Sequence, residues 1–207
     1  MRIVFFGKPG SGKGTQAQRL SRALGLPHLS SGDLLRGEIE DRTELGLRIE
    51  PYVLRGEIGP EELIAAAVLE RIGRRGHGDG YILDGFPRTL LQAGELDAAF
   101  PPHKCILLDV ADRTAAGRIT GRLTCRRCGA VFHASARPPR LAGTCDLCEG
   151  ALEARADDTA GAVMRRLEIF HTQVGPVLKW YANDGRLVVV DAEGLPDAVE
   201  AAVRAAL

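Results

Sequence analysis

The sequence has no apolar run near the roughly 20 residues that a membrane-spanning helix needs. It also has no excess charge of one sign, because 27 Lys and Arg residues balance 27 Asp and Glu residues. We therefore expect no membrane partner, and the balanced charge argues against a general nucleic-acid binder while leaving room for local basic pockets. The apolar stretch at residues 3–6 is too short for a signal peptide, so a cytoplasmic protein is predicted.

Internal repeats and low-complexity segments are absent as well, and the histidines form no recognisable group. The five histidines show neither the spacing of a metal site nor that of a catalytic triad: His28, His77, His103, His133 and His171. We expect all five to be structural or surface residues, so the chemistry of this chain must come from other side chains.

Short apolar segments alternate with helix-length amphipathic segments along the 207 residues. Continuous apolar strands separated by helices are typical of a parallel sheet that helices cover on both faces. The length suits one α/β domain with insertions. The predicted strands are 3–6, 27–30, 81–83, 105–110 and 187–190, and the predicted helices are 13–24, 60–74, 88–99, 112–122, 158–182 and 196–206.

Two segments interrupt this alternation. Residues 31–59 are polar and mostly helical, whereas residues 123–155 hold four cysteines, two adjacent prolines and several glycines. Both are predicted to be insertions in the α/β core. The boundaries that follow are a core of 1–29, 60–121 and 157–207, a first insertion of 30–59 and a second insertion of 122–156.

The first predicted strand leads into the loop Gly7-Lys8-Pro9-Gly10-Ser11-Gly12-Lys13-Gly14-Thr15, and a predicted helix follows. Glycines let the backbone N–H groups of such a loop point inward at an anion, and the helix N-terminus adds partial positive charge. Lys13 is expected to reach the β- and γ-phosphates of a nucleotide, and the Thr15 hydroxyl to ligate Mg²⁺. The expected phosphate contacts are Gly10, Ser11, Gly12, Lys13, Gly14 and Thr15.

A second motif follows the third predicted strand: Tyr81-Ile82-Leu83-Asp84-Gly85-Phe86-Pro87-Arg88-Thr89. Asp84 ends a parallel strand and should lie at the carboxyl edge of the sheet, where it can orient Mg²⁺ through water. Gly85 and Pro87 predict a turn, after which Arg88 projects back across that edge. Because a guanidinium matches a phosphate bidentately, the motif predicts a second phosphate site.

Four cysteines form two C-x-x-C knuckles, Cys125 with Cys128 and Cys145 with Cys148. Two such knuckles build a closed tetrahedral site of four thiolates, which is the structural arrangement for Zn²⁺. Unpaired thiols, a disulfide pair and an iron–sulfur cluster are the alternatives, although the spacing differs from that of ferredoxins. The fifth cysteine, Cys105, lies in a predicted strand and is expected to be a core residue.

The two phosphate motifs together resemble the adenylate kinase family. G-x-P-G-x-G-K-G-T resembles the loop of nucleoside monophosphate kinases, and D-G-F-P-R-T extends the likeness along nearly the whole chain, with further matches at residues 30–36, 44–46, 92 and 155–158. The second insertion lies where long-lid members carry a lid, which binds zinc in some of them. The resemblance implies a P-loop nucleoside monophosphate kinase fold with a five-stranded parallel sheet and two mobile subdomains, 30–59 closing over AMP and 122–156 forming a zinc-binding lid.

The resemblance also implies which residues hold the substrates. Arg36 and Arg88 would bind the AMP phosphate, Gln92 would hydrogen-bond the adenine edge, and Arg118 would pack by the adenine of ATP. The AMP site would comprise Ser31, Arg36, Glu57, Ile58, Gly59, Gly85, Arg88, Gln92, Arg155 and Arg166, and the ATP site would add Arg118 and Arg122 to the glycine loop.

Arginines dominate both ends of the second insertion. Arg118 and Arg122 are four residues apart on a predicted helix, so we expect them to share a face. Phosphoryl transfer depends mostly on positioning and charge stabilisation, which converging arginines supply, whereas the alternative is a solvated basic helix face. By resemblance the catalytic residues are Lys13, Arg88, Arg122, Arg155 and Arg166.

Two positions differ from the usual family pattern. Ser31 stands where the family usually has Thr, which keeps the hydroxyl but loses a methyl contact. After the last predicted strand the chain has Asp191-Ala192-Glu193-Gly194 in place of D-G. In the family that turn helps to hold the adenine of ATP through backbone groups.

The predicted reaction is ATP + AMP ⇌ 2 ADP, dependent on Mg²⁺ and catalysed by a monomer with a structural Zn²⁺ in its lid and with no nucleic-acid or membrane partner. GTP as donor, or UMP or CMP as acceptor, are the nearest alternatives, and Gln92 and the long lid favour AMP. A non-catalytic nucleotide switch whose cysteine ribbon binds RNA or a protein is a third alternative. Such a switch has no need of Arg36, Arg88 and Gln92 together.

Overall fold

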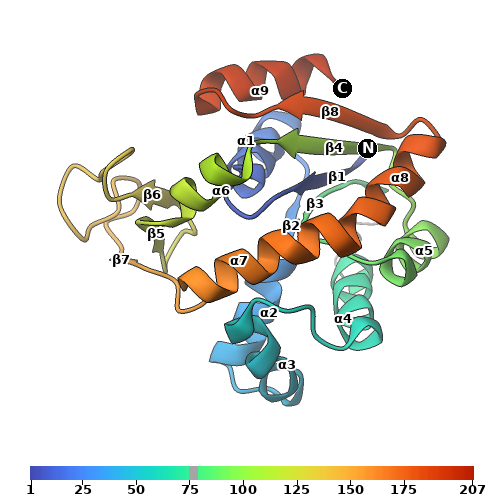
Figure 1. Cartoon of the computed structure of the whole chain (residues 1–207), viewed down its shortest axis with the longest axis horizontal. Coiled ribbons are helices and arrows are strands. Elements are labelled where there is room, and N and C mark those ends of the chain that lie inside the picture. The colour runs from blue at the N-terminus through green and yellow to red at the C-terminus, as the bar shows by residue number, and fades with distance from the viewer. Residues whose placement is uncertain (75–78) are drawn as a thin grey trace.

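A central parallel sheet organises the chain (Figure 1). The structure is a computed structural model that describes residues 1–74 and 79–207, so His77 lies outside the described residues. The sheet has the strand order β2-β3-β1-β4-β8, with every neighbouring pair parallel. The predicted α/β fold with five parallel strands is therefore confirmed. The strands are β1 (Arg2–Gly7), β2 (His28–Ser30), β3 (Tyr81–Asp84), β4 (Lys104–Asp109) and β8 (Leu187–Asp191).

Helices follow the strands, as the alternating sequence pattern predicts. None of the helices in the described ranges is both long and apolar enough to cross a membrane. The helices of the core are α1 (Lys13–Leu24), α4 (Glu61–Arg74), α5 (Leu90–Ala99), α6 (Asp112–Ile119), α7 (Ala160–Ile169), α8 (Gly175–Asn183) and α9 (Pro196–Ala205).

Both faces of the sheet are buried, because side chains along each strand alternate between two apolar clusters. On β1, Ile3 and Phe5 belong to a cluster with residues of α1 and α9, whereas Val4 and Phe6 belong to a cluster with residues of α4, α5 and α8. A strand that is buried on both faces needs apolar residues at every position. This requirement explains why the strand segments are continuous apolar runs in the sequence.

Two predicted helices differ from the structure. The helix predicted at 112–122 ends at Ile119, because Gly121 has a left-handed φ of 85° and the chain then turns into a strand. The helix predicted at 158–182 is divided into α7, the π-helical segment η2 (Phe170–Val174) and α8. Pro176 lies at the start of α8 and has no N–H to donate, so the regular helical hydrogen-bond ladder cannot continue through it.

The first insertion consists of two helices that cross at a glycine, α2 (Ser31–Glu40) and α3 (Glu44–Arg55). The Thr43 hydroxyl caps α3 by accepting a hydrogen bond from the Gly46 N–H at 3.0 Å. A β-carbon on Gly46 would lie 1.9 Å from the carbonyl oxygen of Glu38. Only glycine therefore allows the two helices to approach this closely.

The second insertion forms a small antiparallel sheet, which lies at the left of Figure 1. Its strands are β5 (Arg122–Cys125), β6 (Val131–His133) and β7 (Leu152–Glu153), in the order β6-β5-β7. The buried members of its apolar cluster are Cys125, Ala130, Phe132, Cys145 and Leu152. A cluster of this size buries little apolar surface, so the segment needs another source of stability.

Candidate active site

The glycine loop lies at the carboxyl end of β1 and opens helix α1. Gly10 and Gly12 have left-handed φ values of 81° and 91°, which glycine adopts without strain. A β-carbon on Gly10 would lie 2.2 Å from the carbonyl oxygen of Ala115, so the loop also docks against α6. Gly12 precedes α1 without a side-chain cap, which leaves the first N–H groups of the helix, near Gly14 and Thr15, available to an anion.

Lys13 stands in the first turn of α1 and its ammonium turns back into the loop. Its Nζ donates to the carbonyl oxygen of Lys8 at 3.2 Å. Burial lowers the pKa of Lys13 to about 8; the nearby Asp84 carboxylate opposes this shift, and the cation of Arg88 adds to it. The two motifs adjoin here, because a β-carbon on Gly14 would lie 3.2 Å from Asp84 Oδ2.

Asp84 ends β3, as predicted, and the next turn carries Arg88 back over the sheet edge. Gly85 has a φ of 81°, and its carbonyl oxygen accepts a hydrogen bond from Arg88 Nε at 2.8 Å. Burial lowers the pKa of Arg88, and the like charge of Arg166 adds to the effect. The backbone N–H of Arg88 donates to Gln92 Oε1 at 2.9 Å, and within the described residues the buried Nε2 of Gln92 has no partner.

Two consecutive aspartates hold two arginines, Arg122 at the start of the second insertion and Arg166 in α7. Arg122 Nε donates to Asp158 Oδ2 at 2.8 Å, and Arg122 Nη2 donates to Asp158 Oδ1. Arg166 Nη2 lies 3.2 Å from Asp157 Oδ2 and also donates to the carbonyl oxygen of Asp157. Burial alone would raise the pKa of the Asp157 carboxyl, but Arg166 and other nearby arginines outweigh it and lower that pKa.

Arg36 and Arg155 approach the same region from the two insertions. Arg36 Nη2 donates to Asp33 Oδ1 at 2.5 Å, and Arg155 Nε donates to Thr124 Oγ1 at 3.2 Å. Burial, together with the nearby cation of Arg36, lowers the pKa of Arg155 to about 10. The two guanidiniums are therefore close enough to repel each other.

Positive charge exceeds negative charge across this whole region. Among the described residues of this site, six cations face four carboxylates, which leaves a surplus of two positive charges in a partly buried site. Such a site favours a multiply charged anion, because an opposite charge at short range in a poorly solvated region stabilises the charged forms of both groups. The cations are Lys13, Arg36, Arg88, Arg122, Arg155 and Arg166, and the carboxylates are Asp33, Asp84, Asp157 and Asp158.

Arg118 and Arg122 do not share a helix face, so that prediction is wrong. Helix α6 ends before Arg122, which begins β5. Arg118 instead reaches the turn after β8, where its guanidinium donates to the carbonyl oxygens of Ala192 and Glu193, each at 2.9 Å. The Glu193 carboxylate accepts the backbone N–H of Ala111 at 2.6 Å, so this turn is tied to both ends of α6.

Glu57, Ile58 and Gly59, which the resemblance assigns to the AMP site, follow the end of α3. The Glu57 carboxylate pairs with Arg55 at 2.8 Å, on the surface. Ile58 is partly buried against the cluster on the α4 side of the sheet. A β-carbon on Gly59 would lie 3.3 Å from the side chain of Ile64. The side chain of Glu57 is thus engaged locally, and the backbone of this segment is the part that remains for a ligand.

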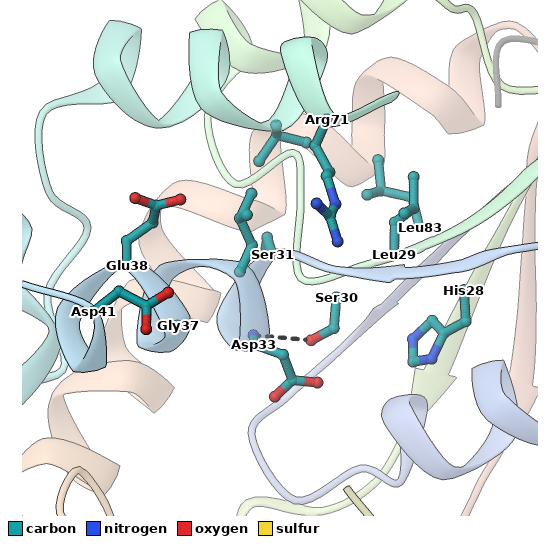
Figure 2. Close-up of a pocket in the computed structure, with 12 residues that line it drawn as sticks. His28, Leu29, Ser30, Ser31, Asp33, Gly37, Glu38, Asp41, Arg71 and Leu83 are labelled. Carbon is teal, nitrogen blue, oxygen red and sulfur yellow. Dashed lines mark hydrogen bonds between the residues drawn. The ribbon is translucent and has the colours of Figure 1, made fainter. Parts of the chain in front are cut away.

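A cavity of about 380 Å³ lies beside the site, among β2, α2 and α4 (Figure 2). Leu29 and Leu83 line it, together with Ser31, whose hydroxyl is buried and has no partner within the described residues. His28 lines it as well, and its Nε2 lies 3.8 Å from Asp84 Oδ2. This contact could not be predicted from motif spacing, because it depends on the pairing of β2 with β3.

The four clustered cysteines converge at the edge of the second insertion. The Sγ atoms of Cys125 and Cys148 are 3.5 Å apart, those of Cys128 and Cys145 are 3.6 Å apart, and all four lie within 4.8 Å of one another. A tetrahedral site with metal–sulfur bonds of about 2.3 Å has edges of about 3.8 Å. The cluster could therefore hold a metal ion, whereas Cys105 is buried apart from it in β4.

The parallel sheet presents the glycine loop and the arginine-bearing turn at one edge, with a crossing helix pair and a small lid sheet inserted beside them. This architecture defines the class of P-loop nucleoside monophosphate kinases.

Comparison with known proteins gives the family within that class. The family model described as adenylate kinase matches residues 5–186. An adenylate kinase of Caldicellulosiruptor saccharolyticus is 39% identical over 99% of this chain and 98% of its own length. An adenylate kinase of Methanosarcina acetivorans is 41% identical over 92% of this chain and 91% of its own. The chain belongs to the adenylate kinase family and is thus an enzyme, a nucleoside monophosphate kinase, as the resemblance implies.

Proposed function

We propose that this chain catalyses ATP + AMP ⇌ 2 ADP with Mg²⁺, through a donor site and an acceptor site that meet at the arginine cluster. The surplus of positive charge around Lys13 and Arg88 carries the proposal, because the transferred group is anionic throughout the reaction. No general base is required, since the acceptor phosphate already carries negative charge.

The proposed donor site is the glycine loop with two arginines. When ATP binds, Lys13 Nζ would release the carbonyl oxygen of Lys8 and bind oxygens of the β- and γ-phosphates. A charged phosphate oxygen forms a stronger hydrogen bond with a buried ammonium than a neutral carbonyl oxygen does. Arg122 would exchange Asp158 for the transferred phosphoryl group, and Arg118 would act at the adenine side. The proposed contacts are Gly10, Ser11, Gly12, Lys13, Gly14, Thr15, Arg118 and Arg122.

The proposed acceptor site binds the AMP phosphate with Arg36 and Arg88 and the base with Gln92. Since Gln92 Oε1 already accepts the Arg88 N–H, its Nε2 is the group left for a ligand, and it is a donor. A donor suits N1 of adenine, which accepts, and not the N–H of guanine or uracil at the corresponding position. Ser31, Glu57, Ile58, Gly59 and Gly85 would line this site, and Arg155 and Arg166 would bridge it to the donor.

Mg²⁺ would be oriented by the Thr15 hydroxyl and, through water, by Asp84. Bound to the phosphates of ATP, it supplies further neutralisation of charge on the transferred group. Asp84 supports this assignment because it lies beside Gly14 at the end of β3 and forms no hydrogen bond with its other neighbour, His28, at 3.8 Å.

The four-cysteine cluster is proposed to hold a structural Zn²⁺ through Cys125, Cys128, Cys145 and Cys148. Support comes from the sulfur separations, which are close to those of a tetrahedral zinc site, and from the small apolar cluster around them. Four thiolates leave no open position for substrate, so the metal would stabilise the lid and take no part in the chemistry.

The two insertions are proposed to move. Residues 30–59 would close over AMP and residues 122–156 over ATP, against a core of 1–29, 60–121 and 157–207, because the phosphoryl group must be shielded from water. Gly121, with its left-handed φ, is a proposed hinge. We also propose a monomer acting in the cytoplasm, where clustered thiols stay reduced.

A nucleotide panel tests the proposed reaction. ATP or GTP is offered with AMP, UMP, CMP or GMP, and the products are separated by chromatography. ATP with AMP should react fastest, and Arg88→Ala should lose at least about 10²-fold in rate. The matched control is Arg74→Ala, which removes an exposed guanidinium paired with Glu70. Turnover of UMP as fast as AMP would overturn the acceptor, and ATP binding without transfer would favour a nucleotide switch.

A further inference from the structure

A lysine with no role in the sites above connects the glycine loop to helix α6. The Nζ of Lys8 donates to the carbonyl oxygen of Val110 at 2.6 Å and lies 2.8 Å from Asp112 Oδ1. The side chain of Lys8 is only 12% exposed, although that of Asp112 is 52% exposed. The carbonyl oxygen of Lys8 accepts hydrogen bonds from the Ser11 N–H at 3.0 Å and from Lys13 Nζ. One residue thus helps to set the curl of the loop and also fixes its position.

The first turn of α6, which Lys8 contacts, is itself anchored from other sides. Asp112 Oδ2 lies 3.0 Å from His171 Nε2 in η2, and the preceding N–H, that of Ala111, is held by Glu193. One turn further along the helix, the Ala115 carbonyl contacts Gly10. The loop therefore meets α6 at two points, one of them an ion pair.

We propose that Lys8 is a positioning residue for the donor nucleotide, and that its ion pair with Asp112 holds the loop ready for phosphate before a nucleoside triphosphate binds. The loop contains glycine at positions 7, 10, 12 and 14, and glycine loses the most conformational freedom on ordering. A loop that is ordered in advance avoids that loss at the moment of binding. The inference rests on the proposed donor site.

The role of Lys8 is distinct from that of Lys13. Both acceptors that engage the Lys8 ammonium lie at the start of α6, outside the curl of the loop, so Lys8 acts on ATP through the backbone. The proposed phosphate contacts of AMP, Arg36 and Arg88, lie on other elements. Losing the ion pair should therefore change the binding of ATP and leave that of AMP unchanged.

Steady-state kinetics of Lys8→Met, with each substrate varied in turn, provide the test. Methionine keeps most of the aliphatic stem but removes the charge. KM for ATP should rise about fivefold, which corresponds to about 1 kcal/mol and suits a half-exposed ion pair. KM for AMP and kcat should stay within about twofold of wild type. Asp112→Asn should reproduce the effect, and the double variant should be no worse than either single one.

Two controls isolate the ion pair. Lys104→Met removes a lysine whose Nζ also donates to a carbonyl, that of Ala206 at 2.7 Å, but at the far end of β4. His171→Gln removes the other partner of Asp112. Both should leave KM for ATP unchanged.

Three outcomes would overturn the inference. An equal rise in both KM values, or a fall in melting temperature with no selective change, would show that Lys8 is only structural. A lower KM for ATP in Asp112→Asn would show that Lys8 binds phosphate directly once released. If the wild-type protein makes no ADP from ATP and AMP, the proposed reaction fails, and calorimetry with ATP alone then decides whether Lys8→Met weakens donor binding.

Discussion

The ion pair between Arg122 and Asp158 links the point where the chain enters the second insertion to the point where it leaves. Arg122 is the first residue of β5, and Asp158 lies shortly before α7. Their side chains are 14% and 7% exposed, so each charge depends on the other. Asp158→Asn should lower the free energy of unfolding by about 3 kcal/mol, because it leaves a buried guanidinium without its counter-charge. Inorganic phosphate should raise the melting temperature of this variant more than that of the wild type, because the Asp158 carboxylate no longer competes with phosphate for Arg122.

Thermal unfolding with and without phosphate measures both effects. Asp197→Asn is the matched control, because its carboxylate pairs with Arg19 but is 90% exposed. The interpretation of Asp158 as a stand-in for phosphate is wrong if phosphate stabilises the variant and the wild type equally.

Lys13 should give the reaction a pH limit. Burial lowers its pKa to about 8 in the free enzyme, so kcat/KM for ATP should fall as pH rises through about 8. In the complex, bound phosphate raises that pKa, and kcat should stay level to higher pH. A fall of kcat and kcat/KM at the same pH would contradict this assignment.

The same pKa shift predicts an effect on stability. Below about pH 8 Lys13 is charged in both states, and burial of that charge opposes folding. Between about pH 8 and 10.5 the unfolded chain keeps a proton that the folded chain has lost, so stability rises with pH. Lys13→Met should therefore raise the free energy of unfolding at pH 7 by about 2 kcal/mol while abolishing activity. Lys179→Met, at an exposed position, should change neither.

Gly46→Ala should disrupt the crossing of α2 and α3. Its β-carbon would overlap the Glu38 carbonyl, so the helices must separate, at a cost of about 2 kcal/mol in the free energy of unfolding. KM for AMP should rise with it. Gly37→Ala is the control, because a β-carbon there would meet nothing within 4 Å, and it should leave stability unchanged or slightly higher. Equal melting temperatures for the two variants would exclude the close contact.

Metal analysis should find one zinc ion per chain, lost when Cys125 and Cys128 are both changed to Ser. Since metal-binding energy then serves as folding energy for the lid, the metal-free protein should be cleaved by trypsin at the lid arginines while the core resists. The thiol control is Cys105→Ala, which should keep its metal. Reduced thiols, an intact lid and no stoichiometric metal together would refute a zinc site.

Much of the fold could be predicted because its signals are local. The continuous apolar runs indicate strands that are buried on both faces, and the glycine loop and the turn from Asp84 to Arg88 each lie within nine residues of sequence. Local spacing is sufficient when one short segment carries the whole motif. The end of a helix is harder to predict than its presence. Helix α6 ends at Ile119, although the apolar pattern in the sequence continues beyond that residue.

Contacts between distant segments could not be predicted in this way. The contact between His28 and Asp84 requires the strand order, and the ion pair of Lys8 with Asp112 requires the packing of the glycine loop against the start of α6, more than a hundred residues along the chain. The same holds for Asp158, which pairs with Arg122 from 36 residues away along the chain. A sequence motif predicts the charged residues that bind a ligand. It does not predict which carboxylates pair with those residues while the ligand is absent.

Arg118 donates its hydrogen bonds in the turn after β8 to backbone carbonyl oxygens, those of Ala192, Glu193 and, at 3.4 Å, Gly194. The Glu193 carboxylate also ties the turn to the Ala111 N–H, and that tie depends on the side chain. The hydrogen bonds from Arg118 do not, because every amino acid supplies a backbone carbonyl oxygen. That independence explains how a chain that lacks the usual D-G pair there can still retain an anchored turn.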